Sequence, residues 1–245
     1  MHRDVILLVY NSTPTIVVQD SVLADDLCQY IISLAKDVGL RPNLISSNGK
    51  NIRDELRTSS GIGVDFGENE VIDEVYKSMA TMCHLPVAHA ETMSIQRYMP
   101  GEEYKPHWDG YVDNEDLPLS ARVAECGNRP VTIIGCLNDS DAATVFPHLG
   151  FGIQSMQGRV IMFGNLDEDK EPHPLSMHMG TTPREGEKWI FTLWFREKPY
   201  METEKKLSKK KSKKSSERNF NPEKHAENVM KKAKDIMKER GAMPI

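Results

Sequence analysis

The chain has 245 residues, of which 39% are hydrophobic and 27% are charged, the proportions of an ordinary soluble globular protein. This length suits one large domain, or one domain with an appendage. No apolar run approaches the roughly 20 residues that a membrane-spanning helix needs. The apolar run at residues 5–10 is also too short for a signal-peptide core. We therefore expect no membrane partner.

The four cysteines show neither CxxC pairing nor the density of a disulfide framework. Each has apolar neighbours, which is typical of reduced thiols in a protein core. We expect Cys28, Cys83, Cys126 and Cys136 to be reduced, and the protein to be cytoplasmic.

The net charge of −5 conceals an asymmetry along the chain. Residues 201–245 hold 14 Lys and Arg against 7 Asp and Glu, whereas residues 1–200 hold 17 against 29. This predicts a folded acidic body at 1–200 and a basic tail at 201–245. The tail combines a Lys/Ser-rich linker at 205–216 with a short amphipathic helix between Asn221 and Gly241. The basic run leaves nucleic-acid contact open, but it lacks the interleaved aromatic residues that would favour it.

In chain order, the body begins with predicted strands at residues 5–10 and 16–18. A helix follows at 21–38, with Asp20 or Ser21 as its N-cap and Gly39 at its end. A polar loop at 46–67 separates it from a second helix at 69–83.

After Pro86 the pattern changes to short strands that are separated by Gly, Pro and Asp. The predicted strands lie at residues 92–98, 107–111, 130–137, 144–146, 159–163, 175–179 and 188–196. Many short strands of this kind are typical of a β-sandwich or a jelly-roll barrel. The sequence thus predicts a mainly β, α+β fold whose N-terminal helices pack on one outer face of a sheet.

The segment His107-Trp108-Asp109 lies in one of these predicted strands. Residues i and i+2 of a strand project to the same face, so His107 and Asp109 would point together and Trp108 away from them. A site of two histidines and one carboxylate leaves about three coordination positions open, which is typical of non-haem iron(II) oxygenases. A lone His-X-Asp is more often a surface pair, so this interpretation needs a third ligand.

Three downstream histidines are candidates for that ligand. His173 lies between two prolines, which suits a strand poorly, and His148 lies in a loop. His178 lies in a predicted strand, and a turn at 183–186 leads from it into the next strand. If these two strands form a hairpin, His178 would lie roughly opposite Lys188, on the same face.

Both faces of the strand at 188–196 are predicted to be buried. Lys188, Ile190, Thr192 and Trp194 share one face, and the other consists of Trp189, Phe191, Leu193 and Phe195. A buried Lys costs several kcal/mol unless an anion meets it. No acidic residue is evident on the same strand pair, so a ligand carboxylate is one solution. The alternative is a Lys188 side chain that extends from the strand end to water.

Together these residues resemble the prolyl 4-hydroxylase family of Fe(II)- and 2-oxoglutarate-dependent dioxygenases. The likeness runs in consistent order from about residue 15 to 197 and leaves out the basic tail. Its matching stretches are Arg57-Thr58-Ser59-Ser60, Tyr98 to Asp109, Arg129 to Thr132 with Leu137-Asn138, Thr144 to Pro147, Gly158 to Phe163 and His178 to Trp194.

The resemblance implies a double-stranded β-helix, which is a cupin-like jelly-roll barrel with the metal inside one mouth. It implies Fe(II) held by His107, Asp109 and His178, with 2-oxoglutarate as co-substrate, O2, and ascorbate as an additional reductant. By position, Lys188 would bind the distal carboxylate of 2-oxoglutarate.

The resemblance also assigns Tyr98 and Thr144 to hydrogen bonds with the co-substrate. The family usually has a Gly-Gly-X-Thr run here, whereas Asp141-Ala142-Ala143 precede Thr144 in this chain. Glycine permits backbone conformations that alanine tolerates poorly, so the turn into Thr144 is the point at which a difference is expected.

On the substrate side, the resemblance implies that Tyr104, Arg129 and Trp194 line the pocket. The loop at 57–60, which contains Arg57, would be a mobile cover over a peptide groove. The implied activity is hydroxylation of a prolyl residue in a peptide or protein, with release of succinate and CO2. An acidic body would suit a basic substrate segment.

Two alternatives remain open. One keeps the chemistry but has another residue, a free amino acid or a small molecule as its target. The other is a catalytically silent metal-binding barrel that serves as an interaction module, with the basic tail as its working part.

Overall fold

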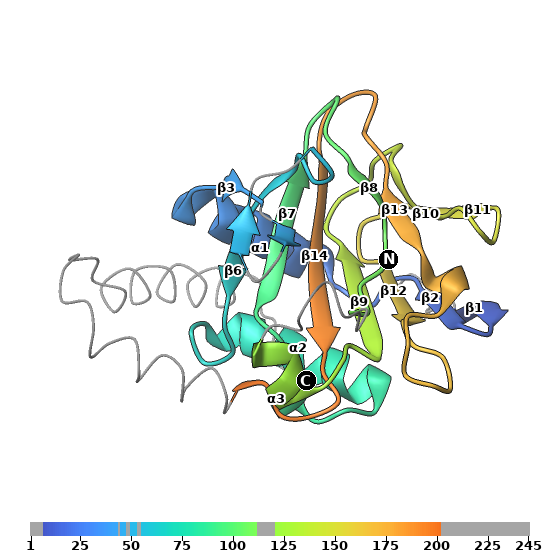
Figure 1. The fold of residues 1–245 in the computed structure, drawn as a ribbon. Helices are drawn as coiled ribbons and strands as arrows, with labels where there is room; N and C mark the ends of the chain where they lie inside the picture. Colours follow the sequence, from blue (N-terminus) through green and yellow to red (C-terminus); the bar gives the residue numbers. More distant parts are fainter. Residues whose placement is uncertain (1–6, 44, 48–49, 53–54, 112–120, 202–245) are drawn as a thin grey trace.

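The computed structural model describes residues 7–43, 45–47, 50–52, 55–111 and 121–201. The predicted basic tail and its helix therefore lie outside the described residues. Within them, two antiparallel sheets face each other and helices cover the back of the larger sheet (Figure 1). This is the predicted mainly β, double-stranded β-helix fold.

The larger sheet has eight antiparallel strands, with β14 near its centre between β9 and β7 (Figure 1). In spatial order they are β1 (Leu7–Ser12), β2 (Thr15–Gln19), β12 (Val160–Gly164), β9 (Val131–Cys136), β14 (Lys188–Phe195), β7 (Met93–Tyr98), β6 (Ser60–Val64) and β3 (Arg41–Pro42).

The smaller sheet has four antiparallel strands and supplies the opposite wall of the barrel. In spatial order they are β11 (Phe151–Gln154), β10 (Ala143–Phe146), β13 (His178–Gly180) and β8 (Tyr104–His107). A separate pair, β4 (Ile45–Ser47) and β5 (Lys50–Ile52), precedes β6.

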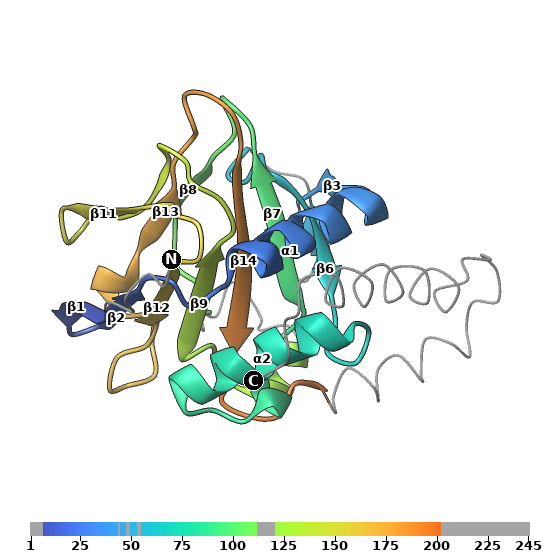
Figure 2. The same cartoon turned by 180° about the vertical axis from the view of Figure 1, so that it is seen from behind.

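Helices α1 (Asp25–Val38) and α2 (Glu70–Cys83) cross the back of the larger sheet (Figure 2). The Asn69 side chain caps α2 by accepting hydrogen bonds from two backbone N–H groups. The shorter elements are α3 (Ala121–Cys126) and the 3-10 turns η1 (Val87–His89) and η2 (Pro174–Ser176).

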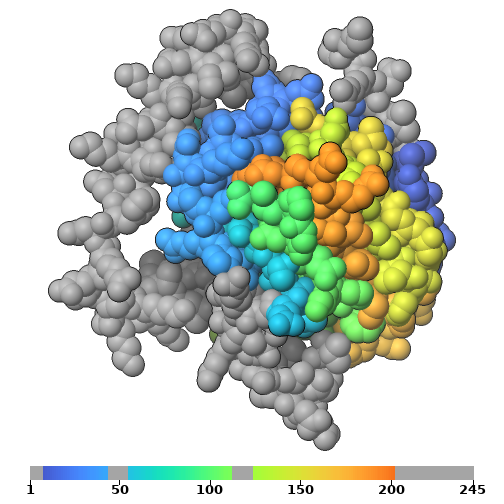
Figure 3. Space-filling model, turned by 90° about the horizontal axis from the view of Figure 1, so that it is seen from above, coloured from blue at the N-terminus to red at the C-terminus, as the bar shows by residue number. Residues whose placement is uncertain are grey.

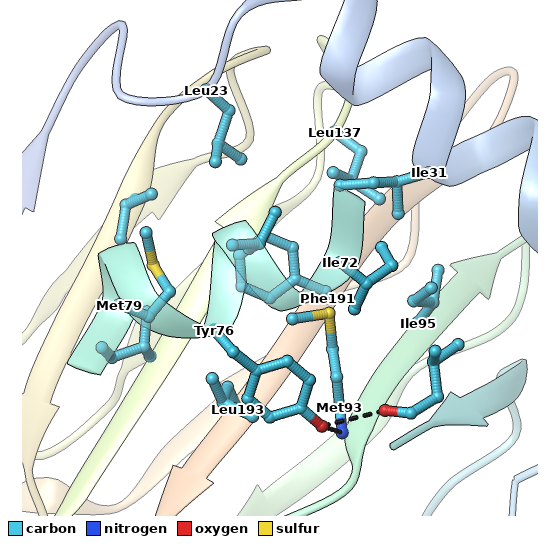
Figure 4. Close-up of a cluster of buried hydrophobic side chains, with 14 of the residues drawn as sticks. Leu23, Ile31, Ile72, Tyr76, Met79, Met93, Ile95, Leu137, Phe191 and Leu193 are labelled. Atoms are coloured by element: carbon cyan, nitrogen blue, oxygen red, sulfur yellow. Dashed lines mark hydrogen bonds between the residues drawn. The ribbon is translucent and has the colours of Figure 1, made fainter. Parts of the chain in front are cut away.

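An apolar layer fills the space between these helices and the larger sheet (Figure 4). Ile31 and Ile72 reach it from the helices and Phe191 from β14, each with no exposed surface. Gly135 of β9 lies opposite Phe191, and a side chain at that position would collide with the Phe191 ring. The aromatic ring therefore requires glycine as its cross-strand neighbour.

Tyr76 of α2 is the polar exception in this layer. Its hydroxyl accepts from the Met93 amide at 2.6 Å (Figure 4). Its single hydrogen is shared between the backbone carbonyls of Val64 at 2.9 Å and Glu91 at 3.0 Å. The hydroxyl thus ties the helix to β6 and to the start of β7.

At the upper end of the barrel, the turn after β7 meets the segment between β13 and β14. The residues near 100, drawn in green, lie beside those near 185, drawn in orange (Figure 3). The Gly101 amide donates to the Thr182 hydroxyl at 2.7 Å. The two connections are therefore in direct contact at this end of the sheets.

Four predicted element boundaries were wrong. The predicted strand at 175–179 begins only at His178, because Pro174–Ser176 form the 3-10 turn η2. The first helix begins at Asp25 rather than near Ser21, because Asp20 pairs with Arg159 and Ser21 adopts a left-handed φ of 59°. Part of the predicted loop at 46–67 is strand β6, which pairs with β7. The predicted strand at 107–111 ends at His107.

The predicted hairpin between the strands of His178 and Lys188 was also wrong. β13 pairs with β10 and β8, whereas β14 pairs with β7 and β9 in the other sheet. Lys188 therefore lies opposite Tyr98, not opposite His178. Sequence proximity suggested a local pairing, but the chain crosses between sheets at this point.

All four cysteines are free, as predicted, and Cys28, Cys126 and Cys136 are buried. None of the helices in the described part of the chain has both the length and the apolar character needed to cross a membrane.

Candidate metal centre and co-substrate pocket

Cross-strand pairing brings two histidines together. His107 is the last residue of β8, and His178 is the first residue of β13, directly opposite it. Their ring centroids are 4.3 Å apart. The candidates that the sequence left open are thus resolved in favour of His178. His148 instead faces the Pro174 carbonyl, and His173 accepts from the Leu175 amide.

Asp109 joins this pair from the bend that follows β8. Its Oδ1 lies 3.7 Å from His107 Nε2, and its Oδ2 lies 3.4 Å from His178 Nε2. Trp108, by contrast, is 40% exposed. The predicted arrangement of His107 and Asp109 inward and Trp108 outward is therefore present, although a bend produces it instead of a continuous strand.

Among the described residues, His107, Asp109 and His178 form the one group of His, Cys, Asp or Glu whose ligand atoms lie within 4.8 Å of one another. Each imidazole faces a backbone carbonyl through Nδ1: His107 that of Lys105 at 2.7 Å, and His178 that of Ser176 at 3.0 Å. A carbonyl only accepts, so Nδ1 carries the hydrogen and the lone pair of Nε2 faces the cluster.

The charges of this cluster suit a cation. Burial, together with the adjacent His178, lowers the pKa of His107 to about 3, so this imidazole is neutral at neutral pH. Burial alone would raise the pKa of Asp109, but the neighbouring His178 and His107 hold it at about 2. Two histidine nitrogens and one carboxylate are the ligand set of an open-sided iron(II) site.

Lys188 points into the same pocket from the larger sheet. Its side chain is 1% exposed, which excludes the alternative that it extends to water. Its ammonium donates to the Ala143 carbonyl at 3.0 Å and makes no ion pair with any carboxylate of the described residues. Burial lowers the pKa of Lys188 to about 8. A buried cation without a counter-ion is a binding site for an anion.

The pocket between the sheets holds both features. It encloses about 360 Å³ of empty space, which includes the open mouth. Its walls comprise Arg57, Gln96, Tyr98, Tyr104, His107, Asp109, Ile134, Thr144, His178, Gly180, Lys188, Ile190, Thr192 and Trp194. The face of β14 predicted to carry Lys188, Ile190, Thr192 and Trp194 is indeed the face that lines the pocket.

Tyr98 and Thr144, expected beside the co-substrate, both line this pocket. Burial raises the pKa of the Tyr98 hydroxyl, which therefore remains a donor. None of the residues 141–143 has a positive φ, and Ala143 begins β10. The Asp-Ala-Ala sequence thus forms this turn without the conformations that require glycine.

The substrate-side predictions divide into two groups. Tyr104 and Trp194 line the pocket, and Tyr104 stacks on His107 with ring centroids 3.5 Å apart. Arg57 also lines it, with its guanidinium 4.9 Å from the Tyr104 ring. Residues 57–60, expected to be a mobile cover, are bonded to the segment before β8 through Thr58 and Glu103.

Arg129 lies behind the pocket wall and is not among its lining residues. Its guanidinium forms two hydrogen bonds of 2.7 Å with Glu91 and stacks 4.4 Å from the Trp194 ring. Arg196 donates to the same carboxylate at 3.0 Å. Arg129 is therefore placed to support Trp194.

Gln96 and Thr192 are pocket residues to which sequence reasoning gave no role. Tyr98 donates to Gln96 Oε1 at 2.9 Å, and Gln96 Nε2 donates to the Thr192 hydroxyl at 2.9 Å. Gln96 could have been predicted to face the pocket, because it lies two residues before Tyr98 and residues i and i+2 of a strand share a face.

Comparisons with known proteins agree with this geometry. No family model matches the chain. Two prolyl 4-hydroxylases from Arabidopsis thaliana, probable prolyl 4-hydroxylase 7 and prolyl 4-hydroxylase 2, are 27% and 28% identical to it over 77% and 75% of its length. The chain spans 64% of the first relative and 68% of the second.

A solved structure shows a similar fold. The viral collagen prolyl hydroxylase of Paramecium Bursaria Chlorella virus-1, crystallised as its 2OG complex, superposes with a TM-score of 0.59 at 25% identity. The match covers 74% of this chain and 95% of the viral protein. In sequence, in fold and in its cluster of two histidines and one carboxylate, the chain is similar to the prolyl 4-hydroxylases.

Proposed function

We propose that this protein is an Fe(II)- and 2-oxoglutarate-dependent dioxygenase that hydroxylates a prolyl residue in a peptide or protein. The observation that carries the proposal is Lys188, a fully buried cation without a carboxylate partner, in the same pocket as the His107, Asp109 and His178 cluster. A metal site alone does not specify a co-substrate. An ammonium in the same pocket selects one that carries an acidic group at its far end.

The residues divide the work in the following way. His107, Asp109 and His178 would hold iron(II), which when bound supplies O2 activation coupled to decarboxylation of 2-oxoglutarate to succinate and CO2. Lys188 would bind the distal carboxylate and so orient the co-substrate. The Tyr98 hydroxyl, which donates to Gln96 Oε1 in this structure, would turn to donate to the co-substrate when it binds.

Thr144 and Thr192 face the same space and can direct hydroxyl groups to the co-substrate. Gln96 already donates to the Thr192 hydroxyl oxygen, so the hydrogen of Thr192 is available for a ligand. The apolar side chains of Ile134 and Ile190 line the rest of this wall and limit the access of water.

The mouth of the pocket suits a peptide. Tyr104 and Trp194 offer flat aromatic walls, which can pack against the ring of a prolyl residue. The curated relatives carry the name prolyl 4-hydroxylase, which supports the same substrate class. Residues 1–200 hold 29 acidic against 17 basic side chains, so we expect peptides with basic flanks to be preferred.

The test is turnover of the full chain with Fe(II), 2-oxoglutarate, ascorbate and a panel of proline-containing peptides. The panel carries acidic, neutral or basic flanks, and each peptide has a matched version with alanine in place of proline. Mass spectrometry reports the oxygen gained, and a separate assay reports succinate. We expect both products with proline peptides, most strongly with basic flanks.

Other outcomes separate the alternatives. Succinate without an oxidised proline would mean that the chemistry is right and the target is another residue, a free amino acid or a small molecule. Metal binding without succinate in any mixture would support the silent interaction module. Lys188→Ala removes the ammonium from the pocket and tests its role in these assays. Lys170→Ala, which changes a side chain that is 74% exposed, is the control for it.

A further inference from the structure

A chain of buried hydrogen bonds lies behind Asp109. The Thr132 hydroxyl of β9 donates to Asp109 Oδ2 at 2.7 Å. The Asn165 side chain, just after β12, donates from Nδ2 to the Thr132 hydroxyl at 2.8 Å. Neither Thr132 nor Asn165 has exposed surface, and neither lines the pocket. Their polar groups therefore serve Asp109, not solvent or a ligand.

The direction of these bonds follows from what each group can donate. An ionised carboxylate only accepts, so the single hydrogen of Thr132 is used for Asp109. The Thr132 oxygen must then accept from its other neighbour, which fixes the Asn165 amide with its nitrogen toward Thr132. In this orientation Asn165 Oδ1 has no hydrogen-bond partner among the described residues. An unpartnered buried acceptor is costly, and its retention suggests a functional constraint.

Asn165 is also connected to a second residue of the cluster, through its backbone. Its carbonyl lies 3.2 Å from the Ser176 hydroxyl, which shares its hydrogen between this carbonyl and that of His173 at 2.8 Å, and the Ser176 carbonyl faces His178 Nδ1 at 3.0 Å. The Asn165 side chain thus leads to Asp109, and its main chain leads to His178. Replacement of the side chain removes only the first connection.

We propose that Asn165, acting through Thr132, is a positioning residue that orients the Asp109 carboxylate for metal binding. The Thr132 hydroxyl occupies Oδ2, which leaves Oδ1 as the better ligand and favours attachment through a single oxygen. Single-oxygen attachment keeps the remaining coordination positions free for other molecules. The proposal rests on the metal centre of the proposed function, but it concerns affinity for the metal and does not depend on turnover.

The test measures binding of Mn(II) to the full metal-free chain by electron paramagnetic resonance titration. Outer partners of metal ligands typically contribute about 10- to 100-fold in affinity. We expect Thr132→Val and Asn165→Ala each to weaken Mn(II) binding by about this factor. Thr132→Ser, which keeps the hydroxyl, should retain most of the affinity. In the Thr132→Val background, Asn165→Ala should add nothing further.

Ser155→Ala is the matched control, because Ser155 is also buried and its hydroxyl bonds to the Asn138 carbonyl away from the cluster. It should leave Mn(II) affinity unchanged. Melting temperatures of the metal-free variants measure any purely structural contribution.

Unchanged Mn(II) affinity in Thr132→Val overturns the proposal, even if its melting temperature falls. An additive loss in the double variant also overturns it, because Asn165 would then not act through Thr132. If Asn165→Ala does not fold, the comparison of Thr132→Val with Thr132→Ser still decides. Failure of the unaltered chain to bind Mn(II) would instead overturn the metal centre itself, and this proposal with it.

Discussion

The two faces of β14 are both covered by other parts of the protein but differ in their chemistry. On the side of the helices, the strand presents only apolar side chains, Trp189, Phe191, Leu193 and Phe195. On the side of the pocket it presents Lys188, Ile190, Thr192 and Trp194. Both faces are buried, so burial alone does not distinguish a stabilising surface from a reactive one. The pocket face is distinguished by polar groups that can still bind a ligand.

This comparison predicts that substitutions on the pocket side change ligand binding, whereas substitutions on the helix side change the free energy of unfolding. The following experiments test that separation, starting with the largest expected effect.

Asp109→Asn should lower turnover by more than about 1,000-fold, because even outer partners of metal ligands contribute about 10- to 100-fold. The amide has the same shape but no charge, and the metal-free protein should melt close to the unaltered chain. Succinate formation and differential scanning calorimetry are the two measurements. A large fall in melting temperature would mean that Asp109 has a structural role as well.

Phe191→Ala should lower the free energy of unfolding by about 3–5 kcal/mol, since it leaves a cavity opposite Gly135 in the apolar layer. Urea unfolding measures this loss. The KM for 2-oxoglutarate of the remaining folded protein should not change. A selective rise in that KM would break the separation between the two faces.

Lys188→Ala should raise the KM for 2-oxoglutarate by about 30-fold or more, which corresponds to about 2 kcal/mol for the loss of one partner of a buried charge pair. The free energy of unfolding without co-substrate should not fall, because the variant removes a buried cation that no carboxylate neutralises. A loss of stability without an effect on KM would contradict the assigned role.

Titration of Lys188 should change the KM for 2-oxoglutarate less than its replacement by alanine. Burial lowers its pKa from 10.5 to about 8, so the amine loses its charge above pH 8. The KM for 2-oxoglutarate should be nearly constant below pH 8 and rise about tenfold for each further pH unit. Lys188→Arg keeps its charge throughout this range and should remove the dependence.

The lowered pKa of Lys188 weakens co-substrate binding at high pH, but it has the opposite effect on the free energy of unfolding of the ligand-free protein. Between pH 8 and 10.5 the unfolded chain binds more protons at this position than the folded chain. The contribution of Lys188 to the free energy of unfolding should therefore increase with pH across this window. Thermal unfolding of the unaltered chain and of Lys188→Arg across this pH range would measure the difference.

Strand alternation made much of the pocket predictable. The period of two along 188–196 indicated which side chains share a face, and the structure agrees at each position from Lys188 to Phe195. The same rule placed His107 and Asp109 together, although the strand ends before Asp109.

The pairing of strands that belong to different sheets could not be predicted from the sequence. The His178 and Lys188 strands are near in sequence but belong to different sheets, and short connections favour the local hairpin that the sequence suggested. The Thr132 and Asn165 contacts were missed for the same reason, since 33 residues separate these two positions. The start of the first helix was misjudged because Asp20 binds Arg159, which lies 139 residues away.

The two-residue alternation of β14 also limits how this segment can change in length. A single inserted or deleted residue between Lys188 and Phe195 would exchange the two faces beyond that point. Aromatic rings would then enter the pocket, and hydroxyl and ammonium groups would enter the apolar layer. Exposed connections such as residues 147–150, which join β10 to β11, have no such constraint. Natural variation in length should therefore accumulate in those connections and spare β14.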